Sequence, residues 1–215
     1  MVLSERQKNI LGKTVFEYIR RAEPVSSGWL EHRYDMEISP ATIRLELSYL
    51  TEEGYLEQPH TSAGRVPTDR GYRFFVDESL EKYADTEGAR EESDFSDLVL
   101  AYHRNILWKE GWESVLRAPE FARNEVLLNF TKFLIDLEQN INRVRKDKPL
   151  EIYIGKENPF SNVGDFSMIV CECDFARGQQ GFVAIVGPKR MPYHRNIGLM
   201  HSFVDVWKKR LTLKR

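Results

Sequence analysis

The segment from residue 58 to residue 73 carries side chains that could bind an anion. It contains three arginines against one aspartate, and its turn "HTSAGR" (residues 60–65) has hydrogen-bonding side chains and a glycine but no large aliphatic residue. Arginine pairs with phosphate through charged hydrogen bonds, and glycine lets the backbone approach a ligand closely. The segment therefore predicts a loop that contacts phosphate along a nucleic-acid backbone. The competing interpretation is an ordinary solvated surface turn.

A second set of candidate contacts lies on a predicted helix that begins at Pro40 and ends before Gly54. At ~100° per residue, Ile43, Leu47 and Leu50 fall on one narrow stripe, which we assign to the core. The opposite face holds Ala41, Leu45, Ser48 and Glu52, flanked by Arg44 and Tyr49, with Thr42 near the N-terminal end. Its N-terminal part is small or hydrogen-bonding, as a helix entering the major groove requires. A plain amphipathic helix with a solvated outer face would show the same pattern.

Start and stop signals place these residues within a series of short elements. Ser4 and Gln7 form a capping-box pattern ahead of a helix over residues 5–21, and Ser26 or Ser27 can cap a short second helix. Ser39 followed by proline starts the third helix. A strand over 55–58, a return strand at 66–67 and a fourth helix capped by Thr68 follow. This order is typical of a winged helix-turn-helix, in which Arg65 at the base of the wing contacts phosphate or the minor groove.

Whole-chain composition neither requires nor forbids DNA binding. The chain has 215 residues and a formal net charge of -2, and residues 1–76 carry ten Lys and Arg against eleven Asp and Glu. Any nucleic-acid function must therefore rest on the local charge arrangement. No apolar run reaches the ~18 residues of a membrane span, and the N-terminus lacks the apolar core of a signal peptide. We expect a cytoplasmic protein with no membrane partner.

The C-terminal half predicts helices and strands in an α+β fold. After an acidic, polar linker near residues 83–94, the segment 125–144 has apolar residues at helical spacing, which suit a core or a dimer seam equally: Leu127, Phe130, Leu134, Leu137 and Ile141. Three β-rich runs follow, "LEIYIG", "FSMIVCECDF" and "QGFVAIVGP", and a helix over about 193–211 ends the domain.

Candidate catalytic or metal-binding residues in this half have structural explanations. Cys171 and Cys173 lie on one face of a predicted strand as simple thiols, since the chain offers no other cysteine. The three histidines His103, His194 and His201 have no cysteine or acid at metal-ligand spacing. Glu157 and Asn158 fit a turn after the "IYIG" strand. We therefore expect no enzyme activity, no metal and no cofactor.

Two long blocks resemble the heat-inducible transcription repressor family HrcA. The first runs from "AEPVSSGWLEHRYD" through "ISPATIRLELSYLTEEGYLEQPHTSAGRVPTDRGYRFFVD"; the second includes "IYIGKENPF" and "GPKRM". The resemblance implies a homodimeric repressor that binds an inverted-repeat operator on double-stranded DNA upstream of heat-shock and chaperone genes, with a chaperonin as a possible partner. It implies a GAF-like C-terminal domain, here reduced, with a helical dimerisation segment near residues 112–145. Leu45, at the centre of the DNA-facing side, can contact a thymine methyl.

These observations give one main prediction and one alternative. We expect a winged-helix domain over 1–82, a linker and connecting helix over 83–108, and a reduced GAF-like sensor or dimerisation domain over 109–215. The expected DNA contacts are Ser39, Ala41, Thr42, Arg44, Leu45, Ser48, Tyr49, His60, Thr61, Ser62, Gly64, Arg65 and Arg70. The alternative is a winged-helix module that docks a chaperone or another protein without binding specific DNA.

Overall fold

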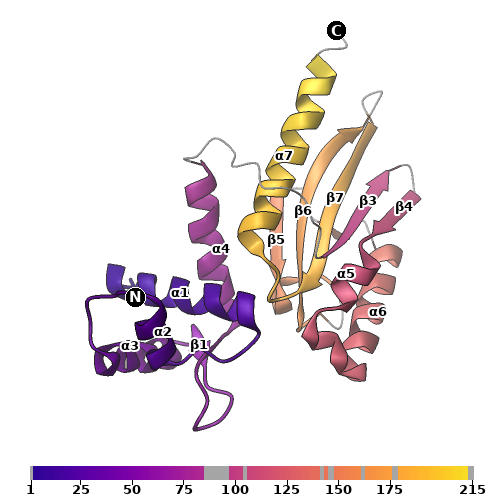
Figure 1. Ribbon diagram of the computed structural model, residues 1–215. Coiled ribbons are helices and arrows are strands. Elements are labelled where there is room, and N and C mark those ends of the chain that lie inside the picture. The colour runs from indigo at the N-terminus through magenta and orange to yellow at the C-terminus, as the bar shows by residue number, and fades with distance from the viewer. Residues whose placement is uncertain are drawn as a thin grey trace. The chain divides into compact units, whose positions relative to one another are not determined.

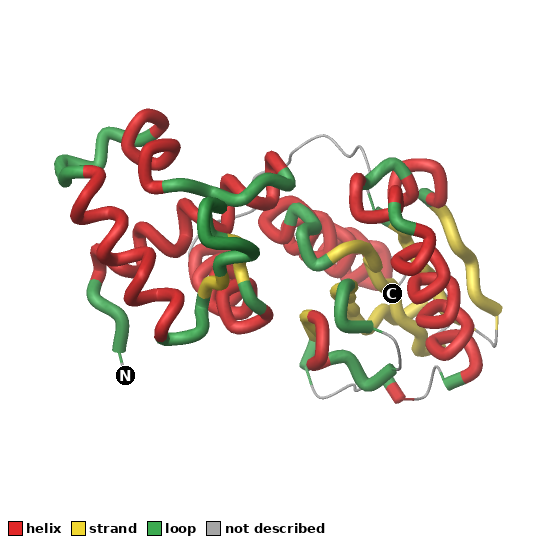
Figure 2. The backbone as a smooth tube through the Cα atoms, turned by 90° about the horizontal axis from the view of Figure 1, so that it is seen from below, coloured by secondary structure: helices red, strands yellow, loops and turns green. Residues whose placement is uncertain are grey.

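The computed structural model describes residues 2–84, 97–103, 106–140, 143–144, 148–160, 163–175 and 179–212. The chain divides into two compact units, Met1–Glu81 and Lys82–Arg215 (Figure 1). Most of the strand in the molecule belongs to the second unit (Figure 2). No helix in the described part of the chain has the length and apolarity needed to cross a membrane.

The first unit is built mainly of helices, with one short hairpin. In chain order it contains α1 (Glu5–Arg21), α2 (Ser27–Arg33), α3 (Pro40–Glu52), β1 (Leu56–Glu57), β2 (Val66–Pro67) and α4 (Asp69–Ala84). β1 and β2 pair antiparallel, with Leu56 opposite Pro67 and Glu57 opposite Val66. The helices begin where the local caps predict. Ser4 and Gln7 form the two halves of the capping box, and Ser26 and Ser39 each accept the backbone N–H three residues ahead.

The buried apolar side chains of the first unit come from all four helices, from the hairpin and from the segments that join them. The stripe predicted for α3 is buried, since Ile43 and Leu50 are fully covered and Leu47 is 4% exposed. Thr68 accepts the amide of Gly71 at the start of α4, as its capping role requires. The remaining buried members are Leu3, Ile10, Leu11, Val15, Ile19, Val25, Leu30, Leu56, Val66, Tyr72, Phe75 and Val76.

The second unit is a five-stranded antiparallel sheet with helices on both faces (Figure 1). Its elements are β3 (Leu98–His103), β4 (Ile106–Glu110), α5 (Trp112–Leu116), the 3₁₀ turn η1 (Pro119–Ala122), α6 (Asn124–Gln139), β5 (Leu150–Ile154), the 3₁₀ turn η3 (Gly155–Glu157), β6 (Phe166–Phe175), β7 (Gln179–Pro188) and α7 (Tyr193–Thr212). The strand order is β4-β3-β7-β6-β5. The α+β class predicted from sequence is confirmed.

Alternation along the strands divides the core of the second unit between the two faces. One face packs against α6 through Phe130 and Phe133, whose rings lie 5.0 and 5.9 Å from that of Phe166 on β6. On the other face Ser167 hydrogen-bonds the buried Tyr193 hydroxyl of α7 at 2.7 Å. Because side chains alternate along a strand, Cys171 and Cys173 share this second face.

The connecting helix predicted within residues 83–108 is not found over residues 98–103 and 106–108, which form strands. Residues 98–103 and 106–110 form β3 and β4, and β3 pairs with β7 as well as with β4. The strands therefore belong to the second sheet instead of a linker. The acidic run expected as the linker lies outside the described residues. So does Ile141, which we had placed on the apolar stripe of α6.

Candidate nucleic-acid interface

The outer face of α3 presents the side chains expected to meet DNA. Leu45 is 72% exposed, and Ala41, Arg44 and Glu52 are exposed as well. The remaining predicted members of the face, Thr42, Ser48 and Tyr49, are half-buried at its edges. An exposed leucine at the centre of a helix face, with the opposite stripe fully packed, leaves this surface available for a partner.

The N-terminal end of α3 is fixed by the serine that caps it. The Ser39 hydroxyl accepts the Thr42 amide at 3.2 Å and lies 3.0 Å from the Thr42 hydroxyl. Proline at the first helical position loses no hydrogen bond there and already has a helical φ. The first turn of α3 therefore holds Thr42 in one orientation beside Ala41.

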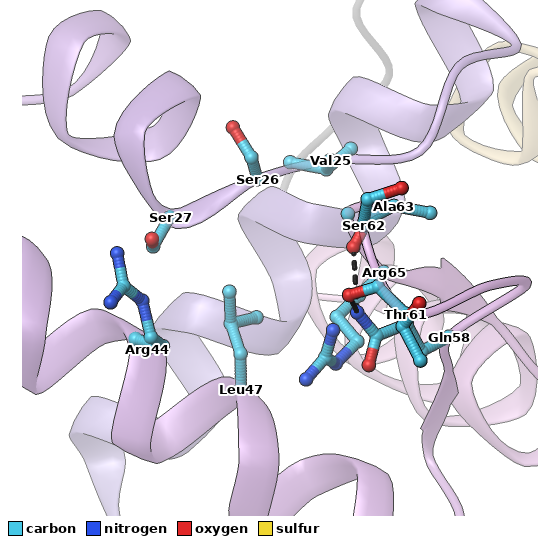
Figure 3. Close-up of a pocket in the computed structure, with 11 residues that line it drawn as sticks. Val25, Ser26, Ser27, Arg44, Leu47, Gln58, Thr61, Ser62, Ala63 and Arg65 are labelled. Carbon is cyan, nitrogen blue, oxygen red and sulfur yellow. Dashed lines mark hydrogen bonds between the residues drawn. The ribbon is translucent and has the colours of Figure 1, made fainter.

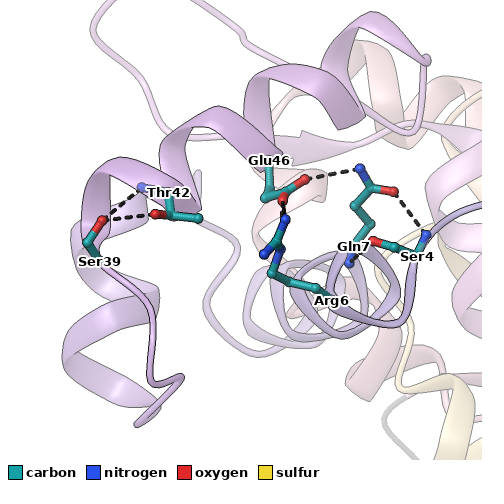
Figure 4. A network of polar contacts seen from close by, with 6 residues as sticks. All are labelled: Ser4, Arg6, Gln7, Ser39, Thr42 and Glu46. Carbon is teal, nitrogen blue, oxygen red and sulfur yellow. Dashed lines mark hydrogen bonds and ion pairs between the residues drawn. The ribbon is translucent and has the colours of Figure 1, made fainter.

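An ion-pair network joins the middle of α3 to the start of α1 (Figure 4). The buried Glu46 carboxylate accepts the Arg6 guanidinium at 2.6–2.7 Å and the Gln7 side-chain amide at 3.0 Å. The Gln7 carbonyl oxygen in turn accepts the Ser4 amide at 3.0 Å within the capping box. One carboxylate thus fixes how α3 rotates against α1. Sequence reasoning missed Glu46, because its partners lie about forty residues away.

Removing this carboxylate should loosen α3 without touching its outer face. We expect Glu46→Ala to lower the free energy of unfolding by ~1–2 kcal/mol, because the buried half of the pair is lost while Arg6 can turn to water. Urea unfolding measures the change. Glu52→Ala, at an exposed position of the same helix, should stay within about 0.5 kcal/mol of the wild type. Equal losses in the two variants would show that the network does not hold α3.

The loop of the β1–β2 hairpin is ordered by its own hydrogen bonds. The Gln58 side-chain amide donates to the carbonyls of Thr61 and Ala63 at 3.0 and 2.9 Å. The His60 ring lies 3.2 Å from the Ser62 hydroxyl. His60, Thr61 and Ser62 are exposed at the tip, as a loop that touches a large partner requires.

Arg65, at the base of the hairpin, is tied to two other segments of the unit. Its backbone exchanges two hydrogen bonds with Val25, at 2.8 and 2.9 Å, as an isolated antiparallel bridge to the segment before α2. Its Nε donates to the Thr51 hydroxyl of α3 at 2.9 Å. Gly64 is packed so closely against this bridge that a Cβ there would lie 2.5 Å from the Val25 carbonyl carbon and oxygen.

Arg70 uses its guanidinium for contacts within the unit. Its guanidinium donates to the Glu53 carbonyl and to the Tyr55 hydroxyl, and it stacks 4.1 Å from the Tyr55 ring centroid. These bonds join the start of α4 to the turn after α3. We therefore expect Arg70 to contribute more to the stability of the unit than to binding.

A hollow of about 370 Å³ lies between α3 and the hairpin (Figure 3). Its walls are Val25, Ser26, Ser27, Arg44, Leu47, Gln58, Thr61, Ser62, Ala63, Gly64 and Arg65. The structure thus brings four predicted loop residues together with one predicted α3 residue around a single space. Leu45, Ala41 and Tyr49 do not line it.

Residues of the second unit that could suggest chemistry are held in structural contacts. The buried Asn158 amide donates to the carbonyls of Gly155 and Phe166, and Glu157 accepts the Ile154 amide at 3.0 Å. Cys171 and Cys173 are buried free thiols with their sulfurs 3.4 Å apart. The pKa of Cys171 is raised above its ordinary value by its hydrogen bond to Cys173 and by burial, which disfavours a reactive thiolate. Within the described ranges no cluster of His, Cys, Asp and Glu could hold a metal ion.

Comparison with known proteins finds a matching family model and similar curated proteins. The model of the HrcA protein C terminal domain matches residues 75–197. A heat-inducible transcription repressor HrcA of Natranaerobius thermophilus is 58% identical over 80 residues, which are 37% of this chain and 23% of the relative. The protein of the same name from Thermoanaerobacter sp. (strain X514) is 46% identical over 133 residues, 59% of this chain and 39% of the relative. These matches cover well under two thirds of either relative.

A solved structure shows the same fold over the whole length. A crystal structure described only as that of a hypothetical protein superposes with a TM-score of 0.85, at 18% identity, over all of both chains. At that identity the likeness concerns the fold alone. The family match extends over more than half of the chain and includes the second part of α4, every strand of the five-stranded sheet and the start of α7. On this evidence the chain belongs to the HrcA family.

Proposed function

We propose that this chain is a transcription repressor that binds double-stranded DNA through its first unit, as a winged helix-turn-helix. In this proposal α3 is the recognition helix, and the β1–β2 hairpin is the wing that follows the DNA backbone. The curated relatives are named heat-inducible transcription repressors, which favours heat-shock genes as targets and the cytoplasm as the place of action. The observation that carries the proposal is the outer face of α3, exposed around Leu45 beside a hollow that two arginines line.

Salt dependence is the test that separates DNA binding from other uses of this surface. Neutralised phosphates release counterions, so the logarithm of the binding constant should fall linearly with the logarithm of the salt concentration. We expect retardation of a random-sequence duplex at low salt that weakens steeply with salt. Absence of any retardation at low salt would contradict the proposal.

The second candidate is a protein-docking module, and Leu45 is the observation that favours it. A leucine 72% exposed at the centre of a surface suits an apolar partner such as a chaperone segment. A docking module would bind its partner with a weak salt dependence and would leave duplex DNA unretarded. The same measurements apply to the chaperonin that the family resemblance implies as a partner.

We propose further that the DNA-binding form is a homodimer, since an inverted repeat mirrors a two-fold axis. The apolar stripe predicted within residues 125–144 suited either a core or a dimer seam. Among its described members Phe130, Leu134 and Leu137 are buried in the core, and Leu127 is exposed. An apolar face of the helical segment that includes Leu127 is exposed. It consists of Trp112 and Leu116 on α5 and Leu127, Leu128 and Ile135 on α6, each between 38% and 60% exposed. This exposed face is our candidate for the seam.

Charges placed on this face should separate the protomers. Leu128 and Ile135 lie seven residues apart on α6, so they share one side of the helix. We expect the double variant Leu128→Glu with Ile135→Glu to be a monomer by light scattering, at a concentration at which the wild type is a dimer. Asn9→Glu, at an exposed position of α1 in the first unit, is the control and should remain dimeric. A dimeric double variant would place the seam elsewhere.

A further inference from the structure

The hollow between α3 and the hairpin is positively charged and has no carboxylate in its walls. Arg44 reaches it from α3 and Arg65 from the hairpin, on two sides of the same space (Figure 3). None of the described residues that line it is an aspartate or a glutamate. Two guanidinium groups with no acid between them repel each other and attract an anion.

Most of the N–H donors of Arg44 and Arg65 have no hydrogen-bond acceptor among the described residues. Among the described residues, no hydrogen bond or ion pair engages the Arg44 guanidinium, and the only side-chain bond of Arg65 is the one from Nε to Thr51. Thr51 itself donates to the Leu47 carbonyl at 2.8 Å, so it presents its oxygen to Arg65 in a fixed direction. Arg65 is thereby held at α3 at the edge of the hollow, and its terminal nitrogens have no partner among the described residues. The hydroxyl-bearing Ser27, Thr61 and Ser62 add further donors around the space.

We infer that the hollow seats one phosphodiester group of the DNA backbone, held jointly by Arg44 and Arg65. This inference rests on the proposed function and assigns Arg44 a role that its place on α3 did not suggest. From the helix wheel alone Arg44 is a candidate for reading a base edge. Because its guanidinium opens on a space shared with the hairpin, it instead fixes the position of the backbone between recognition helix and wing. Base discrimination is left to Thr42, Leu45 and Ser48.

Single substitutions distinguish the two roles of Arg44. A phosphate contact should weaken binding to all sequences by a similar factor and reduce the salt slope by ~1, whereas a base contact should change discrimination. We expect Arg44→Ala and Arg65→Ala each to weaken binding roughly tenfold, both on a duplex selected for tight binding from a random-sequence pool and on its scrambled counterpart. Because they share one phosphate, the double variant should lose less than the product of the two single losses. Lys8→Ala, which removes a charge paired with Glu5 on α1, is the control and should leave affinity within about twofold.

A neutral phosphate analogue locates the seat on the DNA. A series of duplexes is prepared, each with one methylphosphonate at a different position of either strand. Each duplex is titrated with the wild type and with the double variant. We expect one position per half-site at which the wild type loses roughly tenfold and the double variant loses nothing. Loss at that position in both proteins, or in neither, would overturn the shared seat.

The remaining outcomes separate this inference from the proposed function. If Arg44→Ala alters the preferred base and leaves binding to scrambled DNA unchanged, the seat is wrong although the protein binds DNA. A different outcome would show that the hollow binds a free anion and that the inference fails. In that case inorganic phosphate raises the melting temperature of the free protein above its value in chloride at equal ionic strength, and no methylphosphonate position weakens binding of the wild type. If the wild type retards no duplex at low salt, the proposed function fails and the inference fails with it.

Discussion

Replacing Gly64 with alanine is expected to weaken binding to every duplex and to lower the stability of the first unit. A Cβ at this position would lie 2.5 Å from the Val25 carbonyl carbon and oxygen, and 2.8 Å from the Pro24 carbonyl carbon. These are backbone atoms that cannot rotate away, so the segment before α2 and the base of the hairpin must separate. The two backbone hydrogen bonds between Val25 and Arg65 would be lost or stretched.

The expected size follows from what is broken. Two backbone hydrogen bonds are worth about 1 kcal/mol each, and the displaced packing adds to this, so we expect a loss of ~2–4 kcal/mol in the free energy of unfolding. Affinity for all sequences should fall at least roughly tenfold, because Arg65 is carried by the displaced strand. The same change leaves the outer face of α3 intact, so sequence preference should be retained.

Hydrogen exchange offers a local measurement of this effect. The amides of Val25 and Arg65 should exchange much faster in Gly64→Ala than in the wild type, because each donates in the bridge. Gly12→Ala is the matched control: it lies in α1 with nothing within 4 Å of the added methyl, and it should stabilise the helix by ~0.5–1 kcal/mol. Unchanged protection of both amides in Gly64→Ala would show that the bridge does not depend on glycine.

Replacing Leu45 with glutamate should abolish most DNA binding without destabilising the protein. The side chain is 72% exposed on α3, so a charge there faces water and costs the fold little. Against DNA the same charge faces the phosphates, and like charges brought together at an interface cost several kcal/mol. We expect affinity for any duplex to fall by roughly a hundredfold at low salt, with the effect shrinking as salt increases.

Leu45→Gln is the control for this change, because it has nearly the same shape and lacks only the charge. It should keep its affinity for scrambled DNA within about tenfold of the wild type, and its amide should favour adenine where leucine favours a thymine methyl. Leu45→Asn should shift the preferred base in the same way. Equal affinities of the Glu and Gln variants, measured by titration of a labelled duplex, would remove α3 from the interface.

Local signals predicted the first unit well because its elements are set by local chemistry. The Ser4 capping box and the Ser39–Pro40 pair act within four residues, so the starts of α1 and α3 follow from sequence. The helix wheel correctly predicted that Leu45 is exposed and that Leu50 is buried, because the helical period matches the pattern of buried side chains along α3. The return strand at Val66–Pro67 could likewise be read from the turn that precedes it.

What sequence missed depends on contacts between distant residues. β3 joins the sheet by pairing with β7, 80 to 88 residues along the chain, as well as with the adjacent β4, and the linker-like stretch before it gave no local sign of a sheet. Glu46 is buried where Arg6 and Gln7 meet it from α1. The inward engagement of Arg70 depends on the Glu53 carbonyl, which the turn after α3 brings within reach. Side-chain type suggested DNA contact for Arg70, and only the tertiary arrangement shows where its donors go.

Selection of bound duplexes from a random-sequence pool tests the central claim most directly. If the first unit reads DNA through α3 and the protein acts as a two-fold dimer, successive rounds should enrich an inverted repeat whose half-sites are spaced by a whole number of helical turns. The selected duplex should bind at least about a thousandfold more tightly than its scrambled counterpart at physiological salt. A pool that shows no enriched motif after selection, with the wild-type protein folded and binding scrambled and pooled duplexes equally, would contradict the claim of a sequence-specific repressor.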